Sequence, residues 1–221
     1  MQQSRGESMT LVGVNLGVAR VVGNSVTGIY KSSTGKPTRV ESLGLVGDVV
    51  SDRRHHGGAD QAVYVYGDDD YEWWRMRESA VLAPGTFGDN LTIAGLSCRD
   101  IFIGDRFRIG NDVVIEATAP RIPCATLAAR MQDKQFPARF KRAERPGFYC
   151  RVLNTGTVVA GDDVEYIEHE QSPRFSVVDM FRLHYQPNPS VELLLQVLEQ
   201  PVAIRERKRL ESILNRKEHM K

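Results

Sequence analysis

The residues best suited to chemistry surround Cys124, in the stretch Arg121-Ile122-Pro123-Cys124-Ala125-Thr126-Leu127. Pro123 favours the start of a helix, because the N–H that proline lacks would have no partner in a first turn. A cysteine in that turn meets unpaired N–H groups and the helix dipole, which together with the charge of Arg121 lower a thiol pKa. The resulting thiolate can be a nucleophile, a redox centre or a soft metal ligand. A small buried hydrophobic side chain is the alternative that stays open.

A second polar cluster is Arg53-Arg54-His55-His56-Gly57-Gly58-Ala59-Asp60. Gly57 and Gly58 permit positive φ and a close approach of backbone to a ligand. Adjacent histidines do not make the i, i+4 pair of a helical zinc site, and no HExxH motif occurs. The cluster favours a site for an anion or a heterocycle, and a solvated turn between strands is the alternative.

Two further segments carry candidate ligand-binding groups. Residues 23–36 are rich in glycine, serine and threonine and include Lys31, so we expect a loop that presents N–H and ammonium groups to an anion. No Walker spacing occurs there. Asn90, in Phe87-Gly88-Asp89-Asn90-Leu91, offers an amide to a ligand or stabilises its own turn.

Hydrophobic patterns indicate which elements position these residues. Alternation predicts strands at Leu11–Ala19, Gln61–Tyr66, Phe148–Leu153 and Val164–Glu168. A helix is expected from Asp69 to about Glu78, capped by Asp68, and an irregular helical insertion from Met131 to Arg145. Short strands separated by glycine turns predict a mainly β fold with a closed or nearly closed barrel.

The C-terminal residues change to a helical pattern. Ser176 and Asp179 resemble a capping box that opens a helix through Tyr185. A second helix is expected from Asn188-Pro189 and a third from Pro201 to about Lys217. We therefore expect a disordered tail at residues 1–9, a barrel domain at 10–170 and a three-helix bundle at 171–221.

Composition limits the class of protein. The 221 residues carry a formal net charge of +1, which argues against binding nucleic acid by bulk charge. No apolar run is long enough to span a bilayer, and the first ten residues lack the apolar core of a secretory signal. Cys98, Cys124 and Cys150 are widely spaced, which supports neither a disulfide framework nor a CxxC site. We expect a cytoplasmic protein, with Cys98 and Cys150 in the core.

Taken together, these features resemble the MOSC domain proteins (molybdenum cofactor sulfurase C-terminal domain). Within that superfamily the sequence is similar to the stand-alone bacterial hydroxylaminopurine-resistance (YiiM-like) family. Six short motifs agree with that family in order and spacing from about Val12 to Glu168, and the helical tail resembles the family's three-helix extension. The motifs are G-L-V-G-D at Gly44–Asp48, H-G-G-A-D at His56–Asp60, F-G-D-N-L at Phe87–Leu91, I-G-D at Ile103–Asp105, R-I-P-C at Arg121–Cys124 and G-F-Y-C-R-V at Gly147–Val152.

The resemblance implies a MOSC β-barrel, a pyranopterin molybdenum cofactor and reduction of N-hydroxylated bases such as hydroxylaminopurine to the amines, a detoxification. Carried over by position, Cys124 is the molybdenum thiolate ligand, and His55 or His56 supplies a proton. The implied cofactor-binding residues are Lys31, Arg53, His56, Gly57, Gly58, Asp60, Asn90 and Arg121. Arginine grips phosphate with two hydrogen bonds, and amides and carboxylates pair with a pterin edge.

The same resemblance implies partners and leaves one alternative. Electrons come from a separate flavoprotein or iron–sulfur protein, a homodimer stays open, and neither a membrane nor nucleic acid is expected. Pyridoxal phosphate belongs to the superfamily only through the full sulfurases, whose pyridoxal-phosphate domain is absent from this sequence. The alternative function is a carrier of molybdenum cofactor or sulfur, with a persulfide on Cys124. A nucleic-acid-binding role would rest on the basic third helix alone, for which a solvated face is the favoured interpretation.

Overall fold

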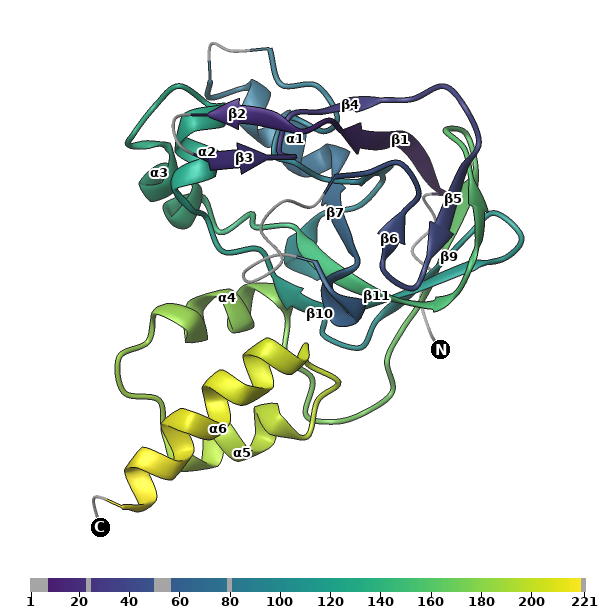
Figure 1. The fold of residues 1–221 in the computed structure, drawn as a ribbon. Coiled ribbons are helices and arrows are strands. Elements are labelled where there is room, and N and C mark those ends of the chain that lie inside the picture. The colour runs from purple at the N-terminus through teal and green to yellow at the C-terminus, as the bar shows by residue number, and fades with distance from the viewer. Residues whose placement is uncertain (1–7, 23–24, 50–56, 79–80, 220–221) are drawn as a thin grey trace.

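The computed structural model describes residues 8–22, 25–49, 57–78 and 81–219, and Figure 1 shows a β-rich body with helices at one end. The strands are β1 (Met9–Gly17), β2 (Arg20–Val22), β3 (Ser25–Thr27), β4 (Lys31–Ser33), β5 (Thr38–Glu41), β6 (Gly44–Leu45), β7 (Val63–Gly67), β8 (Leu91–Ala94), β9 (Arg106–Ile109), β10 (Val113–Pro120), β11 (Phe148–Asn154), β12 (Gly156–Val158) and β13 (Asp163–Ile167). The helices are α1 (Asp68–Arg75), α2 (Ala125–Arg130), α3 (Phe136–Ala143), α4 (Val177–Tyr185), α5 (Val191–Leu198) and α6 (Ile204–Glu218), with short 3₁₀ turns η1 (Ala59–Gln61) and η2 (Cys98–Asp100).

Seven of the described strands close into a barrel. Their order is β1-β8-β7-β11-β10-β9-β13, and β13 pairs back onto β1, with Met9 opposite Val164. Neighbours run antiparallel except β7 and β8, which are parallel. The predicted mainly β fold with a closed barrel and inserted helices is confirmed.

Strand alternation fills the barrel and also covers its outside. On β7, Val63 and Val65 join the main core, whereas Tyr64 and Tyr66 belong to a separate aromatic cluster. Successive side chains of a strand point to opposite faces, so β7 is buried on both. The aromatic cluster, which includes Trp74, packs α1 and α3 against the outer wall of the barrel.

Three helices form a C-terminal extension that lies together beside β10 and β11 (Figure 1). The predicted capping box is confirmed: the Ser176 hydroxyl accepts from the Asp179 N–H at 3.0 Å, and the Asp179 carboxylate accepts from the Ser176 N–H at 3.2 Å. Buried residues of α4, α5 and α6, such as Met180, Leu194 and Leu210, belong to the same core as the barrel. The extension and the barrel therefore share one hydrophobic interior.

Several local predictions were wrong in detail. The expected loop at 23–36 contains β3 and β4, because β3 pairs with β2 and β4 pairs with β1. The first helix begins at Asp68 rather than Asp69, with Gly67 as its N-cap. The last helix begins at Ile204, three residues beyond Pro201.

Other observations concern the cysteines and the helices. Cys98 and Cys150 are fully buried, as predicted. Among the described residues, no helix combines the length and the apolar character that crossing a bilayer requires.

Candidate functional site

A cavity of about 670 Å³ lies outside the barrel wall, against Tyr64 of β7 and Tyr149 of β11. Its other walls come from the β2–β3 hairpin, the segment 27–31, η1 and the residues that lead into α2. Small-molecule sites occupy roughly 300–1,000 Å³, so the cavity has the size of a ligand pocket. The charged, amide and thiol side chains among its lining residues are those of Lys31, Asp48, Gln61, Asn90, Arg121 and Cys124.

Cys124 reaches the cavity from the N-terminus of α2. The residue is the N-cap rather than part of the first turn, with extended backbone (φ −136°, ψ 176°) and a carbonyl that accepts from the Leu127 N–H at 3.1 Å. Pro123 therefore precedes the helix and does not occupy its first position, which corrects the sequence prediction. Cys124 is half-buried, while Cys98 and Cys150 are fully buried and do not line the cavity.

Arg121 places a buried cation beside that thiol. The residue is 3% exposed, and its Nη1 atom has no hydrogen-bond partner. Its guanidinium carbon lies 5.5 Å from the ring centre of Tyr64 and 5.8 Å from that of Phe140. Burial lowers the pKa of Arg121, but Tyr64, Tyr149 and Cys124 raise it, and the net pKa lies above the ordinary value. The guanidinium is charged and has an unused N–H donor.

Another wall holds a network around Asp48. The Asp48 carboxylate pairs with the Lys31 ammonium and accepts hydrogen bonds from the Gly17 N–H at 2.7 Å and the Asn90 amide at 2.8 Å. The Asn90 side-chain oxygen in turn accepts from the Tyr64 N–H at 3.1 Å. Burial lowers the pKa of Lys31, and the Asp48 carboxylate opposes that effect. Asn90 thus positions Asp48 in the cavity wall.

Close backbone approach makes this wall possible. A Cβ on Gly28, which lines the cavity, would stand 1.8 Å from the Val49 carbonyl oxygen. No side chain fits in that distance, so the segment between β3 and β4 can lie against residue 49 only with glycine at this position.

The remaining predicted site residues divide into three groups. Gly57 lines the cavity with φ 70°, whereas Gly58 and Asp60 do not line it. The Asp60 carboxylate accepts from the Ile204 N–H at 2.9 Å and pairs with Arg151 at 3.2 Å, so it links the barrel to α6. The predicted residues Arg53, His55 and His56 lie outside the described residues.

Sequence reasoning missed Asp48, Gln61, Tyr64 and Tyr149, which also line the cavity. Strand alternation is a signal that finds the tyrosines: if Val63 and Cys150 face the core, Tyr64 and Tyr149 must face outward. Asp48 is the last residue of the G-L-V-G-D motif, but nothing in the surrounding sequence indicates that Lys31 is its partner.

These groups can hold an anionic molecule that also carries a soft metal ion able to bind a thiolate. Arg121 offers an N–H donor to an anion such as phosphate, and Cys124 offers sulfur to a soft metal. Within the described part of the chain, no three His, Cys, Asp or Glu side chains gather to hold a metal ion. A metal beside Cys124 would therefore take its other ligands from outside the described residues, for example from an organic group.

The barrel and this cavity define a class of protein: a closed β-barrel with a cavity of ligand size on its outer wall, beside a thiol and a buried guanidinium. A model of the MOSC domain family matches residues 52–165, and the chain belongs to this family. The likeness to YiiM-like MOSC proteins inferred from the sequence motifs is confirmed.

Relatives among curated sequences and solved structures agree with this assignment. YflK of Bacillus subtilis (strain 168) is 30% identical over 88% of this chain and 89% of its own length. A protein called Reductase, from Gibberella moniliformis, is 32% identical over 81% of this chain, which spans only 32% of the fungal protein. The crystal structure of YiiM from Geobacillus stearothermophilus has a TM-score of 0.78 at 24% identity, covering 93% of this chain and 99% of that one. YiiM from Escherichia coli has a TM-score of 0.75 at 18% identity, covering 96% and 94%.

Proposed function

We propose that the protein is a molybdenum-cofactor-dependent reductase that converts N-hydroxylated nucleobases and their analogues, such as hydroxylaminopurine, to the amines. The observation that carries the proposal is the meeting of Cys124 with the buried, partly unsatisfied Arg121 in one cavity. Membership of the MOSC family supports it, as does the fungal relative called a reductase.

The lining residues fit a pyranopterin cofactor. Arg121 supplies an unused N–H donor for a phosphate, and Cys124 supplies one thiolate for the metal. The Lys31–Asp48–Asn90 network offers charged and amide groups to the heterocycle. When bound, the cofactor would supply the electron pair that cleaves an N–O bond to give an amine and water.

The chain's own contribution is orientation, exclusion of water and proton delivery. Arg121 and the aromatic rings beneath it form a wall with little access to solvent, which strengthens hydrogen bonds to an anion. We keep His55 or His56 as the proposed proton donor, and a separate flavoprotein or iron–sulfur protein as the proposed source of electrons.

A persulfide carrier is the competing proposal, because the same half-buried thiol is its only requirement. A persulfide does not need a pocket of about 670 Å³ with a buried guanidinium and an ion pair in its walls. The cavity therefore favours the reductase.

The test is reduction of hydroxylaminopurine by protein from a host that makes the cofactor, with a chemical electron donor. We expect wild-type activity, loss of at least about a hundredfold in Cys124→Ser, as befits loss of a catalytic group, and retained activity in Cys98→Ala. Inactive wild-type protein that gains one sulfur atom on Cys124 from a sulfur donor, seen by mass spectrometry, would establish the carrier instead.

A further inference from the structure

The start of α6 is tied to the barrel beside the cavity. The Ala203 N–H donates to the Thr118 carbonyl of β10 at 3.0 Å, and the Ile204 N–H donates to the Asp60 carboxylate at 2.9 Å. Arg151 of β11 donates to the Pro201 carbonyl at 3.0 Å. These bonds hold the next residue, Arg205, against η1.

Arg205 then binds a residue of the cavity wall. Its Nη1 donates to the Gln61 Oε1 at 2.6 Å, and Gln61 lines the cavity although Arg205 does not. A guanidinium has only donors, so the Gln61 oxygen must face Arg205 whichever way the amide is first assigned. The polar group that remains to Gln61 is its NH₂, a hydrogen-bond donor.

Two further observations place Arg205 close to the cavity wall. Burial raises the pKa of Tyr149 in the cavity wall, and the positive charges of Arg121 and Arg205 both act to lower it. Gly58, at φ 88°, stands next to Arg205, since a Cβ there would lie 3.9 Å from its Nη2. The extension thus brings a second cation to the back of the cavity wall.

We propose that Arg205 is a positioning residue that fixes Gln61 as a hydrogen-bond donor to an acceptor atom of the heterocycle in the cavity. Such an acceptor is a ring nitrogen or a carbonyl oxygen, present both in a pterin cofactor and in a purine substrate. The C-terminal extension is then part of the binding site. The inference rests on the proposed function for the identity of these heterocycles.

Gln61→Glu separates a positioning role from a structural one. The carboxylate keeps Arg205 in place as an ion pair, so we expect a Tm within a few degrees of wild type. It has no N–H to donate, so we expect about tenfold weaker binding, worth about 1.4 kcal/mol. This is measured as less bound pterin per chain or as a higher KM for hydroxylaminopurine. A change in pterin content alone assigns the cofactor as the acceptor, and a change in KM alone assigns the substrate.

Arg205→Ala and Arg207→Ala form a matched pair on α6. Arg207 donates to the Leu198 and Gln200 carbonyls within the extension and does not line the cavity. Both changes lower Tm, but only Arg205→Ala is expected to weaken binding, with partial recovery in Arg205→Lys. Wild-type binding by Gln61→Glu, or equal binding losses in the two alanine variants, overturns the inference.

Failure of the proposed function gives a different result. If wild-type protein carries no pterin and reduces nothing, the Tm shift caused by added free pterin decides the inference. A shift that is kept in Arg207→Ala and lost in Gln61→Glu supports it without the reductase. No shift, or equal shifts in all variants, overturns it.

Discussion

Arg121, which is buried, and Arg145, which is half-buried, differ in what surrounds their guanidinium groups. Arg145 pairs with the fully buried Asp70, whose carboxylate also accepts from the Cys98 N–H at 2.8 Å. Among the described residues no carboxylate pairs with Arg121, which stands over aromatic rings and leaves Nη1 unbonded. The unbonded Nη1 is a buried donor that an anionic ligand would complete.

Replacing each arginine by methionine tests this difference. We expect Arg121→Met to change Tm by only a few degrees, because it leaves no described carboxylate buried without its partner. Arg145→Met leaves Asp70 buried and unpaired, so we expect a loss of about 3–5 kcal/mol. Thermal unfolding of ligand-free protein measures both. A loss in Arg121→Met as large as that in Arg145→Met would show that Arg121 serves the fold rather than a ligand.

The sequence was sufficient to name some of the charged, amide and thiol groups of the cavity wall, although it missed Asp48 and Gln61. Lys31, Asn90, Arg121 and Cys124 were predicted from charge, amide or thiol character, and all line the cavity. Asp60 was named on the same grounds, yet its carboxylate binds the start of α6, a long-range contact that no local pattern reveals. Chemical type predicts candidates, whereas the fold decides which of them meet.

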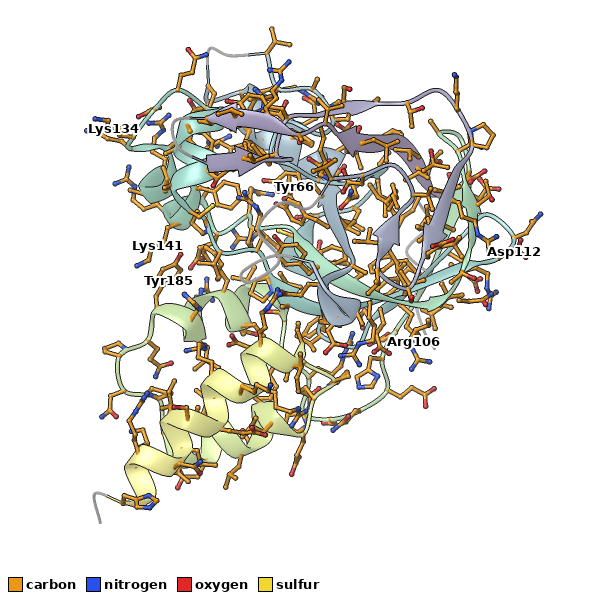
Figure 2. The ribbon with its side chains drawn as sticks, viewed as in Figure 1. Tyr66, Arg106, Asp112, Lys134, Lys141 and Tyr185 are labelled. Atoms are coloured by element: carbon orange, nitrogen blue, oxygen red, sulfur yellow. The ribbon has the colours of Figure 1, made fainter. Side chains whose placement is uncertain are left out.

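At the scale of elements, α4 joins the C-terminal extension to α3, a helix inserted between strands of the barrel. Lys141 of α3 lies 3.7 Å above the ring of Tyr185 of α4, and Figure 2 shows the two side chains together at this junction. Burial lowers the pKa of the neighbouring His184, and Arg209 of α6 and Lys141 lower it further, against Glu206. His184 is therefore held neutral between helices.

This neutrality predicts a pH dependence of stability. The folded pKa lies below the unfolded value of about 6.5, so the unfolded chain binds the proton first as pH falls. The stability that His184 contributes is present above pH of about 6.5 and is lost as pH falls toward and through the folded pKa. As pH is lowered from about 7.5 to 5.5, we expect the Tm of the His184→Gln variant to fall less than the Tm of wild type. Equal losses in the two proteins would contradict this account.

Strands and helices were predicted correctly where the hydrophobic residues followed a clear periodic pattern. β1, β7, β11 and β13 follow clear alternation, the helices of the extension follow an apolar stripe, and α4 has a recognisable capping box. β3 and β4 were missed because Gly, Ser and Thr give little strand signal, and pairing with β2 and β1 creates these strands. Barrel closure through β1 and β13 joins distant parts of the chain, so only the general class was predictable.

At the scale of the whole molecule, the barrel and the extension act as one body. Buried residues of both belong to the main core, and Asp60 joins them by capping α6 and pairing with Arg151. A shared core predicts a single cooperative unfolding transition rather than separate ones for residues 10–170 and 171–221.

Asp60→Ala tests that junction. Loss of the α6 cap and of the Arg151 partner is expected to cost about 1–3 kcal/mol, or about 2–4 °C of Tm per kcal/mol. Asp112→Ala is the control, because Asp112 is exposed and lies away from the extension (Figure 2). Calorimetry should show one transition in each protein. Two resolved transitions in wild type, or equal Tm values for the two variants, would contradict the shared core.

The central claim is that the cavity beside Arg121 and Cys124 binds a molybdenum pterin. Its most direct test is molybdenum and pterin analysis of wild type, Arg121→Met and Cys124→Ser, each purified from a host that makes the cofactor. We predict about one pterin and one molybdenum per wild-type chain, as expected for one cofactor site in the cavity. Pterin should be lost in Arg121→Met, and molybdenum in Cys124→Ser. Wild-type protein without either component, or an Arg121→Met variant that keeps its full pterin content, would contradict the claim.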